Sequence, residues 1–332
     1  MEQRVTMDID TSFIIEIKTL LVSAKNRVYQ NINSVMTQTY FEIGKKIVQE
    51  EQKGEKRAKY GKYILKNLSE ELTKEFGRGY SIDNLENMRK FYLAYSKSET
   101  VSRKFQLSYS HYIFLSKIKN EQERNFYEIE AIENNWSLRE LRRQFDSALY
   151  ERLTLSKDKK ELKELSQKGQ IVQTPQDIIK EPYVLEFLGL EEKSIYSESE
   201  LESKLIDKLE HFLLELGKGF TFVARQKRFS FDEEHFRVDL VFYNRLLKCF
   251  VLIDLKIGKL KHQDLGQMMM YVNYFDRYEK TEDENPTIGI ILCKEKNQTL
   301  VELTLPQDTQ VFASKYQTIL PNKEELKRLL EG

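Results

Sequence analysis

The first 155 residues carry apolar side chains at helical spacing. Between residues 12 and 52 an apolar residue recurs every three or four positions, which predicts one long helix that ends at Lys53-Gly54. The same spacing predicts further helices over residues 58–76, 81–95, 110–119, 121–134 and 138–153. We therefore expect the N-terminal part of the chain to be all-helical.

Two of these predicted helices are separated by a tight turn. Gly77-Arg78-Gly79 ends one helix, and Ser81 is a good N-cap for the next. This is the outline of a helix-turn-helix motif, whose second helix can enter a DNA major groove. The polar residues of that second helix are Asn84, Asn87, Arg89 and Lys90. Arg89 and Lys90 are therefore candidate nucleic-acid contacts, and a plain helical hairpin with a solvated polar face is the alternative.

The pattern changes after residue 177 to short apolar runs. A predicted helix at the start of this part is followed by three strands, a second helix and a wholly apolar strand. These elements are expected over residues 199–216, 220–226, 237–243, 250–256, 264–279 and 287–293. A further strand is expected over 311–316 and a closing helix after Pro321. The order α-β-β-β-α-β is typical of a sheet flanked by helices.

A polar, charge-rich stretch separates the two patterns. Residues 156–176 contain little that could be buried, so we interpret them as a linker. The expected organisation is a helical domain over 1–155 and an α/β domain over 177–332.

Positive and negative side chains are equal in number over the whole chain but are unevenly distributed between its two halves. There are 53 basic and 53 acidic residues in total. Residues 1–160 hold 29 Lys or Arg and 23 Asp or Glu, a net charge of +6, and the remainder holds 24 and 30, a net charge of −6. A basic first half is compatible with a polyanionic partner, although two ordinary solvated surfaces explain the charges equally well.

Composition also bears on the compartment. Cys249 and Cys293 both lie beside predicted strands, as buried free thiols in a reducing compartment do. No signal peptide opens the chain, and no apolar run reaches the roughly 20 residues of a membrane span. We expect a soluble, cytoplasmic protein without a membrane partner.

The candidate chemistry lies on the predicted hairpin of residues 237–243 and 250–256. Side chains alternate across a strand, so Asp254 and Lys256 share one face. Symmetric pairing places Asp239 directly opposite Asp254, about 5 Å away at Cβ. Two like charges this close are destabilising unless a positive charge lies between them. A divalent cation is the simplest explanation, and a surface Asp–Lys ladder with one chance carboxylate is the alternative.

These residues have the spacing of a known nuclease superfamily. Asp239, Asp254 and Lys256 on consecutive strands resemble the PD-(D/E)xK motif, with Asp254 where many members carry Glu. Longer matches identify the chain as a member of the YhcG family (DUF1016) over nearly its whole length. The matching segments include Tyr40-Phe-Glu-Ile-Gly-Lys-Lys, Leu72-Thr-Lys-Glu-Phe-Gly-Arg-Gly-Tyr-Ser, Trp136-Ser-Leu-Arg-Glu-Leu, Val238-Asp-Leu-Val-Phe-Tyr and Asp254-Leu-Lys-Ile-Gly.

The resemblance implies a fold and an activity. The fold is α+β: an all-helical N-terminal domain followed by a restriction-endonuclease-like α/β domain with an αβββαβ mixed sheet. The activity is phosphodiester hydrolysis with Mg²⁺ or Mn²⁺, which hard carboxylate oxygens bind well. Lys256 would orient the attacking water and offset phosphate charge.

The resemblance also implies further site residues. Asp239, Asp254, the backbone carbonyl of Leu255 and Glu202 from the preceding helix would hold the metal. Glu210 and Glu215 lie on the same predicted helix and remain alternatives to Glu202. Gln267 and Tyr271, four residues apart and so on one face of the following helix, would complete the catalytic set.

A basic rim around the hairpin could follow a phosphate backbone. Its members are Arg225, Gln226, Lys227, Arg228, Arg237, Lys259, Lys261 and His262. A solvated basic edge explains them equally well. The function we expect is a metal-dependent endonuclease acting on DNA, with a helical domain that aids DNA binding, binds a partner protein or forms a homo-oligomer. RNA cleavage, and a nuclease fold that binds nucleic acid without cutting it, are the alternatives.

Overall fold

The computed structural model describes residues 11–53, 58–96, 105–154, 159–190, 196–231, 233–306, 308–324 and 326. The chain divides into two compact units, residues 1–142 and 143–332. Residues 143–154 therefore pack with the second unit, whereas the sequence pattern groups them with the helical domain. The functional division at residue 155 remains a prediction.

The described part of the first unit is all-helical, as the apolar spacing predicts. Its helices are α1 (Thr11–Lys53), α2 (Ala58–Phe76), η1 (Arg78–Tyr80), α3 (Ile82–Tyr95), α4 (Tyr109–Leu115), α5 (Glu121–Glu133) and the start of α6 (Leu138–Asp146). Ser81 caps α3, because its hydroxyl accepts the N–H of Asn84 at 3.3 Å. The outline of helix, glycine turn and capped helix is confirmed, whereas groove binding remains a prediction.

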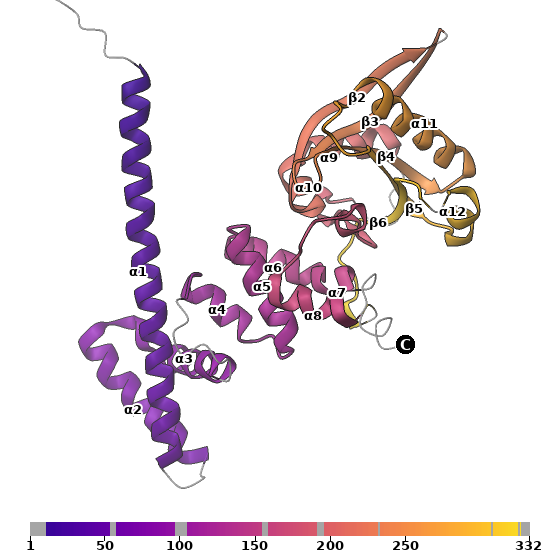
Figure 1. Ribbon diagram of the computed structural model, residues 1–332. Helices are drawn as coiled ribbons and strands as arrows, with labels where there is room; N and C mark the ends of the chain where they lie inside the picture. The colour runs from indigo at the N-terminus through magenta and orange to yellow at the C-terminus, as the bar shows by residue number, and fades with distance from the viewer. Residues whose placement is uncertain are drawn as a thin grey trace, which may run out of the picture. The chain divides into compact units, whose positions relative to one another are not determined.

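Helix α3 packs on the C-terminal half of α1. Leu85, Met88 and Phe91 of α3 are buried. Gly44 of α1 approaches α3 so closely that a Cβ at this position would overlap the carbonyl oxygen of Met88. The N-terminal part of α1 runs on beyond α2 and α3 (Figure 1).

The second unit is built on a six-stranded mixed sheet with the order β1-β6-β5-β4-β3-β2. Its strands are β1 (Tyr183–Val184), β2 (Phe220–Phe231), β3 (Glu234–Asn244), β4 (Cys249–Lys259), β5 (Ile288–Glu295) and β6 (Val311–Gln317). β2, β3 and β4 are antiparallel neighbours, and β4, β5, β6 and β1 are parallel ones. The wholly apolar strand expected from the sequence is β5, which lies between β4 and β6 as a strand buried on both faces should.

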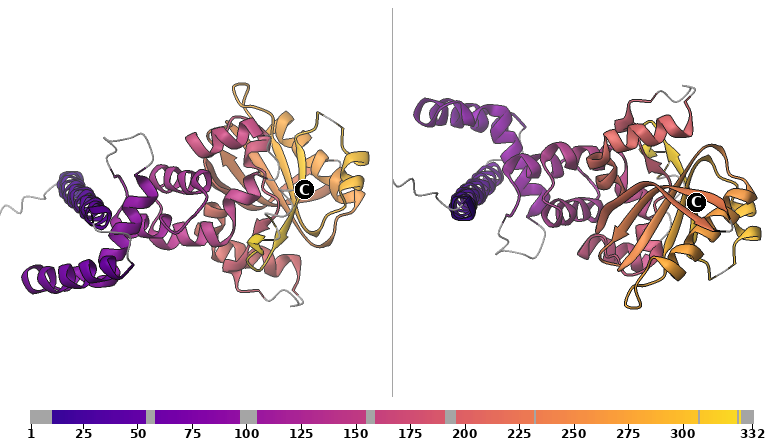
Figure 2. Two further views of the ribbon diagram at one scale, coloured as in Figure 1. Left: turned by 90° about the horizontal axis from the view of Figure 1, so that it is seen from below. Right: turned by 90° about the horizontal axis from the view of Figure 1, so that it is seen from above.

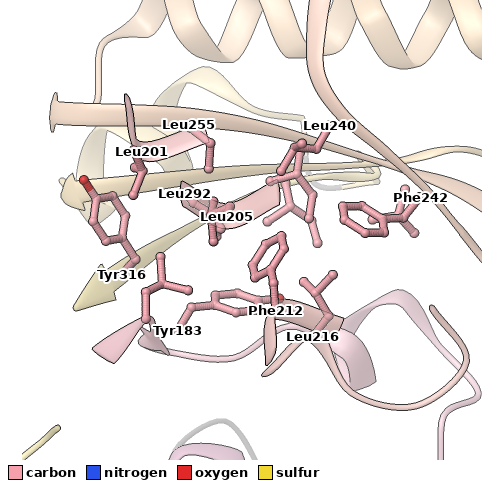
Figure 3. Close-up of a cluster of buried hydrophobic side chains, with 14 of the residues drawn as sticks. Tyr183, Leu201, Leu205, Phe212, Leu216, Leu240, Phe242, Leu255, Leu292 and Tyr316 are labelled. Atoms are coloured by element: carbon pink, nitrogen blue, oxygen red, sulfur yellow. The ribbon is translucent and has the colours of Figure 1, made fainter. Parts of the chain in front are cut away.

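Helices cover both faces of this sheet (Figure 2). The helices of this unit after α6 are α7 (Leu149–Thr154), α8 (Lys159–Lys168), η2 (Pro175–Ile178), η3 (Glu186–Leu188), α9 (Glu198–Asp207), α10 (Leu209–Leu216), α11 (His262–Tyr278) and α12 (Gln298–Thr304). α9 and α10 pack on one face through Leu201, Leu205 and Phe212, which share one hydrophobic core with Leu240 and Phe242 of β3 (Figure 3). α11 packs on the other face, where its apolar side chains contact Val241, Leu252 and Ile291.

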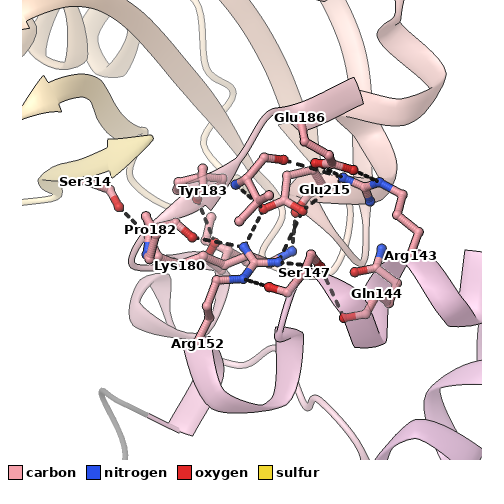
Figure 4. Close-up of polar contacts among 12 residues, drawn as sticks. Arg143, Gln144, Ser147, Arg152, Lys180, Pro182, Tyr183, Glu186, Glu215 and Ser314 are labelled. Carbon is pink, nitrogen blue, oxygen red and sulfur yellow. Dashed lines mark hydrogen bonds and ion pairs between the residues drawn. The ribbon is translucent and has the colours of Figure 1, made fainter. Parts of the chain in front are cut away.

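A buried ion pair ties α7 to α10. Arg152 and Glu215 both have fully buried side chains, and Arg152 Nη1 lies 2.5 Å from Glu215 Oε1 (Figure 4). The same carboxylate accepts the backbone N–H of Val184 in β1 at 2.9 Å. Burial by itself would raise the pKa of Glu215, but Arg152 and Lys180 outweigh it and hold that pKa below its usual range. This ion pair is the reason that residues just before 155 belong to the second unit.

Several elements differ from their sequence predictions. The helix expected over 138–153 is broken at Ala148, whose φ of 54° is left-handed, and the one expected over 199–216 is broken at Lys208. β2 and β3 extend through most of residues 227–236, which lie between two strands expected from the sequence, while β1 and α12 are not among the predicted elements. Part of the expected linker forms α8, where Leu165 is buried. The helix predicted after Pro321 falls mostly outside the described residues.

Candidate active site

The strands of the central hairpin separate next to two aspartates. β3 and β4 pair in a register that sets Leu240 opposite Ile253. The next position along the two strands sets Asp239 opposite Asp254, as symmetric pairing predicts. The ladder ends there, and the backbone N–H of Leu255 donates instead to Oδ2 of Asp239 at 2.9 Å. The charge of Asp239 also acts on the carboxyl group of Asp254, whose pKa it raises. The two acids are therefore held together at the point where the sheet opens.

Asp254 is the more buried of the two. Its residue is 4% exposed, inside the apolar run of β4. Burial, together with the charge of Asp239, raises the pKa of Asp254 from its usual 3.8 to about 7, although Lys256 acts in the opposite direction. Near neutral pH the pair thus either shares a proton or has a cation to replace it.

Lys256 lies on the same face as Asp254. Its Nζ is 2.7 Å from Oδ2 of Asp254 and 3.8 Å from Oε2 of Glu198 at the start of α9. Burial alone would lower the pKa of Lys256, but the charge and hydrogen bond of Asp254 outweigh burial and raise that pKa. Lys256 is consequently a permanent cation at this site.

Gln226 links the aspartates to the preceding helix. Its Nε2 donates to Oε2 of Glu202 at 2.6 Å and to Oδ1 of Asp239 at 3.1 Å. The other oxygen of Glu202 accepts Nε of Arg225 at 2.5 Å. Gln226 adopts a left-handed φ of 49°, which is costly for a residue other than glycine and is offset here by its side-chain contacts. Glu202 thus touches the site through an amide rather than directly.

Gln267 and Tyr271 do share one face of α11, as their spacing predicts. Gln267 Nε2 donates to the hydroxyl of Tyr271. Burial and, next, the charge of Asp254 raise the pKa of Tyr271, which places its ring close enough to feel that carboxylate. These two residues form the α11 side of the site.

The donor set fits a small divalent cation. Within the described residues no three His, Cys, Asp or Glu side chains gather as a metal-binding group. Two carboxylates and the backbone carbonyl of Leu255 would instead supply the protein's share of ligands. Mg²⁺ is commonly bound in this way, by one or two carboxylates with water and substrate phosphate completing its shell. Burial and the charge of Asp239 raise the pKa of Asp254 even though Lys256 lies 2.7 Å away, so this lysine does not fully offset the two carboxylates.

The other acids on the preceding helical segment lie elsewhere. Glu215 is the buried partner of Arg152, and Glu210 is exposed. Of the three alternatives, Glu202 is the one in contact with the site. Two contacts had no sequence signal: Glu198 near Lys256, and the amide bridge made by Gln226, which the basic pattern grouped with nucleic-acid contacts.

The basic rim divides into engaged and exposed side chains. Arg225 is bound to Glu202, and Lys227 lies 3.4 Å from Glu279. Arg228 and Arg237 are exposed and directly opposite each other on β2 and β3. Lys259, Lys261 and His262 are also exposed. In the helical unit, Arg89 Nε is 2.6 Å from Glu51 and Lys90 Nζ is 3.1 Å from Glu86.

Two family models together match most of the chain. The model of the DUF1016 N-terminal domain matches residues 16–152, and that of the YhcG PDDEXK nuclease domain matches residues 176–331. The protein of Escherichia coli (strain K12) named "Putative nuclease YhcG" is 40% identical over 338 residues, which cover 92% of this chain and 90% of that protein. No described helix is long and apolar enough to cross a membrane.

Solved structures of endonucleases show slighter similarity. A repair endonuclease from Pyrococcus abyssi is 19% identical with a TM-score of 0.27, covering 38% of this chain and 50% of its own. The EndoMS–dsDNA2 complex is 16% identical with a TM-score of 0.27, covering 40% of this chain and 48% of its own. The match spans about half of those chains. The two family models and the sequence identity show that the chain belongs to the YhcG family, with a DUF1016 N-terminal domain and a C-terminal PD-(D/E)xK nuclease domain.

Proposed function

We propose that this nuclease is a metal-dependent endonuclease that hydrolyses phosphodiester bonds in duplex DNA. The observation that carries the proposal is the pair of the half-buried Asp239 and the buried Asp254, with Lys256 beside it. Two adjoining carboxylates in a dry site are unfavourable without a cation. Membership of the family supports nuclease chemistry and leaves the metal and the nucleic acid open.

The residues of the site have distinct roles in this proposal. Asp239, Asp254 and the Leu255 carbonyl hold Mg²⁺ or Mn²⁺, which when bound polarises the scissile phosphate and acidifies a water. Lys256 stays protonated, so it donates a hydrogen bond to the phosphate or the attacking water and does not act as a base. Gln226 fixes the carboxylate of Asp239, and Glu202 in turn fixes Gln226.

The α11 pair contributes a neutral hydrogen-bonding wall. Because burial and Asp254 raise the pKa of Tyr271, its hydroxyl keeps its proton at neutral pH. Gln267 donates to that hydroxyl, which leaves the phenolic proton available to a phosphate oxygen or water. We therefore propose that Gln267 orients Tyr271.

The preference for duplex DNA rests on the β2–β3 ribbon. β3 pairs with β4 only as far as Leu240, so the remainder of β2 and β3 continues as a two-stranded ribbon (Figure 1). Arg228 and Arg237 face each other across it, and like charges in that position are unfavourable without an anion between them. A two-stranded ribbon fits the major groove of B-form DNA, whereas the major groove of A-form RNA is too narrow to reach.

Cleavage assays test the catalytic assignment. The full chain is incubated with Mg²⁺ or Mn²⁺ and with linear, supercoiled, single-stranded and branched DNA and with duplex RNA, beside Asp254→Ala and Lys256→Ala. We expect cleavage of duplex DNA and a loss of about 10²-fold or more in each variant. Cleavage that persists in both variants, or that appears on no nucleic acid, refutes the assignment and leaves a fold that binds without cutting.

Binding assays test the ribbon separately. The double variant Arg228→Ala with Arg237→Ala should weaken duplex binding. It should also reduce the slope of log Kd against log salt concentration by the amount that about two lost phosphate contacts give. Arg245→Ala is the matched control, because Arg245 is an exposed arginine at the other end of β3. If the control weakens binding as much as the double variant does, per positive charge removed, the ribbon has no special role. Preferred cleavage of RNA would overturn the choice of DNA.

For the helical unit we propose a role in assembly. Its candidate groove-binding cations, Arg89 and Lys90, are each paired with a glutamate, so a phosphate would have to displace Glu51 or Glu86. Lys90→Ala in the full chain tests the alternative, because it lowers duplex affinity only if α3 contacts DNA.

A further inference from the structure

The N-terminal part of α1 carries an unusual number of exposed apolar side chains. Among the side chains that the structure describes between residues 14 and 35, nine large apolar ones are exposed: Ile14, Ile15, Ile17, Leu20, Leu21, Val22, Val28, Ile32 and Val35. A solvated helix normally keeps such residues on a face that packs against something. Large contiguous apolar patches of this kind mark interaction sites in soluble proteins.

Six of these side chains form one stripe. Ile14, Ile17, Leu21, Val28, Ile32 and Val35 fall within an arc of about 60° on a helix of 3.6 residues per turn. Their exposed fractions run from 38% at Ile14 to 66% at Leu21. Ile15 and Val22 lie outside the arc, on another side of the helix. The stripe is therefore an apolar seam about 33 Å long, at about 1.5 Å of rise for each residue from 14 to 35, with Ala24 and Lys25 at its centre between Leu21 and Val28.

The spacing of the stripe residues is the same when counted from either end of the stripe. Successive members are separated by 3, 4, 7, 4 and 3 positions, and the midpoint falls between Ala24 and Lys25. When two copies of this segment run antiparallel, each stripe residue meets another: Ile14 meets Val35, Ile17 meets Ile32, and Leu21 meets Val28. An interface with two-fold symmetry requires this self-complementarity, because residue i contacts j and j contacts i.

A parallel pairing would use the same arc but would set each stripe residue against its own copy, and it would place the two α2–α3 bodies side by side at one end of the pair. In the antiparallel pair Lys18 lies opposite Asn31, and Lys25 lies opposite Ala24 at the centre, where the two copies of Lys25 are neighbours at the edge of the seam. The antiparallel pair therefore separates the two bodies and leaves one like-charged pair, at the solvated edge of its centre.

The rest of the unit leaves room for a second copy. The side chains that α1 buries within the unit, such as Ile47 and Val48, and the close approach of Gly44 to α3 belong to residues C-terminal to the stripe. An antiparallel partner runs past Ile14 at one end and past Val35 at the other, so the two α2–α3 bodies lie at opposite ends of the pair.

We infer that the chain forms a homodimer through antiparallel pairing of residues 14–35 of α1, seam to seam. The occupant of the stripe is a second copy of this chain. The inference rests on α1 alone and is independent of the proposed nuclease chemistry.

Light scattering of the full chain after size exclusion tests the inference. We expect a mass of about 79 kDa, twice the 39.6 kDa of one chain. The double variant Leu21→Glu with Val28→Glu should halve the measured mass, because four carboxylates would face one another in the seam of the pair. Ile15→Glu with Val22→Glu is the matched control, because it removes two equally exposed apolar residues and adds the same charge outside the stripe. It should leave the dimer intact.

A charge exchange tests the direction of pairing. Leu21→Glu with Val28→Lys places opposite charges across an antiparallel seam and like charges across a parallel one, so it should restore the dimer that Leu21→Glu with Val28→Glu loses. Circular dichroism should be the same for all variants, because these side chains are exposed in the single chain. A monomeric parent chain, equal loss in the Ile15/Val22 control, or failure of the charge exchange to dimerise overturns the inference.

Discussion

Replacing Asp254 by Asn should make the metal-free protein more stable at pH 8 than the parent chain. The folded chain raises the pKa of Asp254 from 3.8 to about 7, through burial and the neighbouring Asp239. The folded state therefore binds more protons than the unfolded state between these two values, and the free energy of unfolding falls as pH rises through that window. Asn resembles the protonated carboxyl group, so the variant avoids this loss and can still donate to Asp239.

The magnitude follows from the width of the window. Each pH unit in which the folded chain holds one extra proton changes the free energy of unfolding by about 1.4 kcal/mol. From pH 5 to about 7, the parent chain should lose on the order of 2–3 kcal/mol relative to Asp254→Asn, with little further change at pH 8. Urea denaturation at pH 5, 6, 7 and 8 with EDTA present measures the difference.

Two results would refute this reasoning. A difference between parent and Asp254→Asn that is independent of pH would mean that Asp254 is ionised throughout, and hence that burial does not control it. A destabilised variant at pH 8 would mean that attraction to Lys256, 2.7 Å away, exceeds the cost of burying the carboxylate. Asp283→Asn, at an exposed acid, is the control and should show no rise in stability at pH 8.

Three further predictions concern the metal, the buried ion pair and the helical unit. Adding Mg²⁺ should raise the Tm more at pH 8 than at pH 5, because the ion competes with the proton of Asp254; equal shifts in differential scanning fluorimetry would argue against binding at the aspartate pair. Arg152→Ala leaves the carboxylate of Glu215 buried without its main partner, so urea denaturation should show a loss of about 3–5 kcal/mol, and a loss below about 1 kcal/mol would contradict the buried pair. Gly44→Ala should lower stability by about 1–3 kcal/mol despite its better helix propensity, because the new methyl overlaps Met88. Gly266→Ala, with open space around its Cβ, should instead be neutral or stabilising, and similar effects of the two changes would refute the close approach.

The parts of the candidate site that depend on residues close together in the sequence were predictable. Alternation along β4 puts Asp254 and Lys256 on one face, and symmetric pairing about the 245–248 turn puts Asp239 opposite Asp254. The helical spacing of Gln267 and Tyr271 likewise gives their contact. In each case the relation follows from the period of a single element or from one short turn.

The remaining contacts depend on which elements meet in three dimensions. Glu202, Glu210 and Glu215 look alike in sequence, because nothing local says that Glu215 will be buried against Arg152 while Glu202 meets Gln226. The break at Lys208 also separates α10 from α9, where the spacing predicts one unbroken helix. Assignment among the three acids therefore required long-range packing.

The sequence by itself determined the two halves of this protein and the acid–lysine face of its hairpin, because hydrophobic period and strand alternation are properties of neighbouring residues. The tertiary structure decided what those residues touch. It placed residues 143–154 in the second unit, where Arg152 and Glu215 form a buried pair, and it showed Gln226 to be a bridge between Glu202 and Asp239 and not a rim residue. Both outcomes join residues more than ten positions apart in the chain, and such contacts are selected by the packing of the whole unit, which no local pattern encodes.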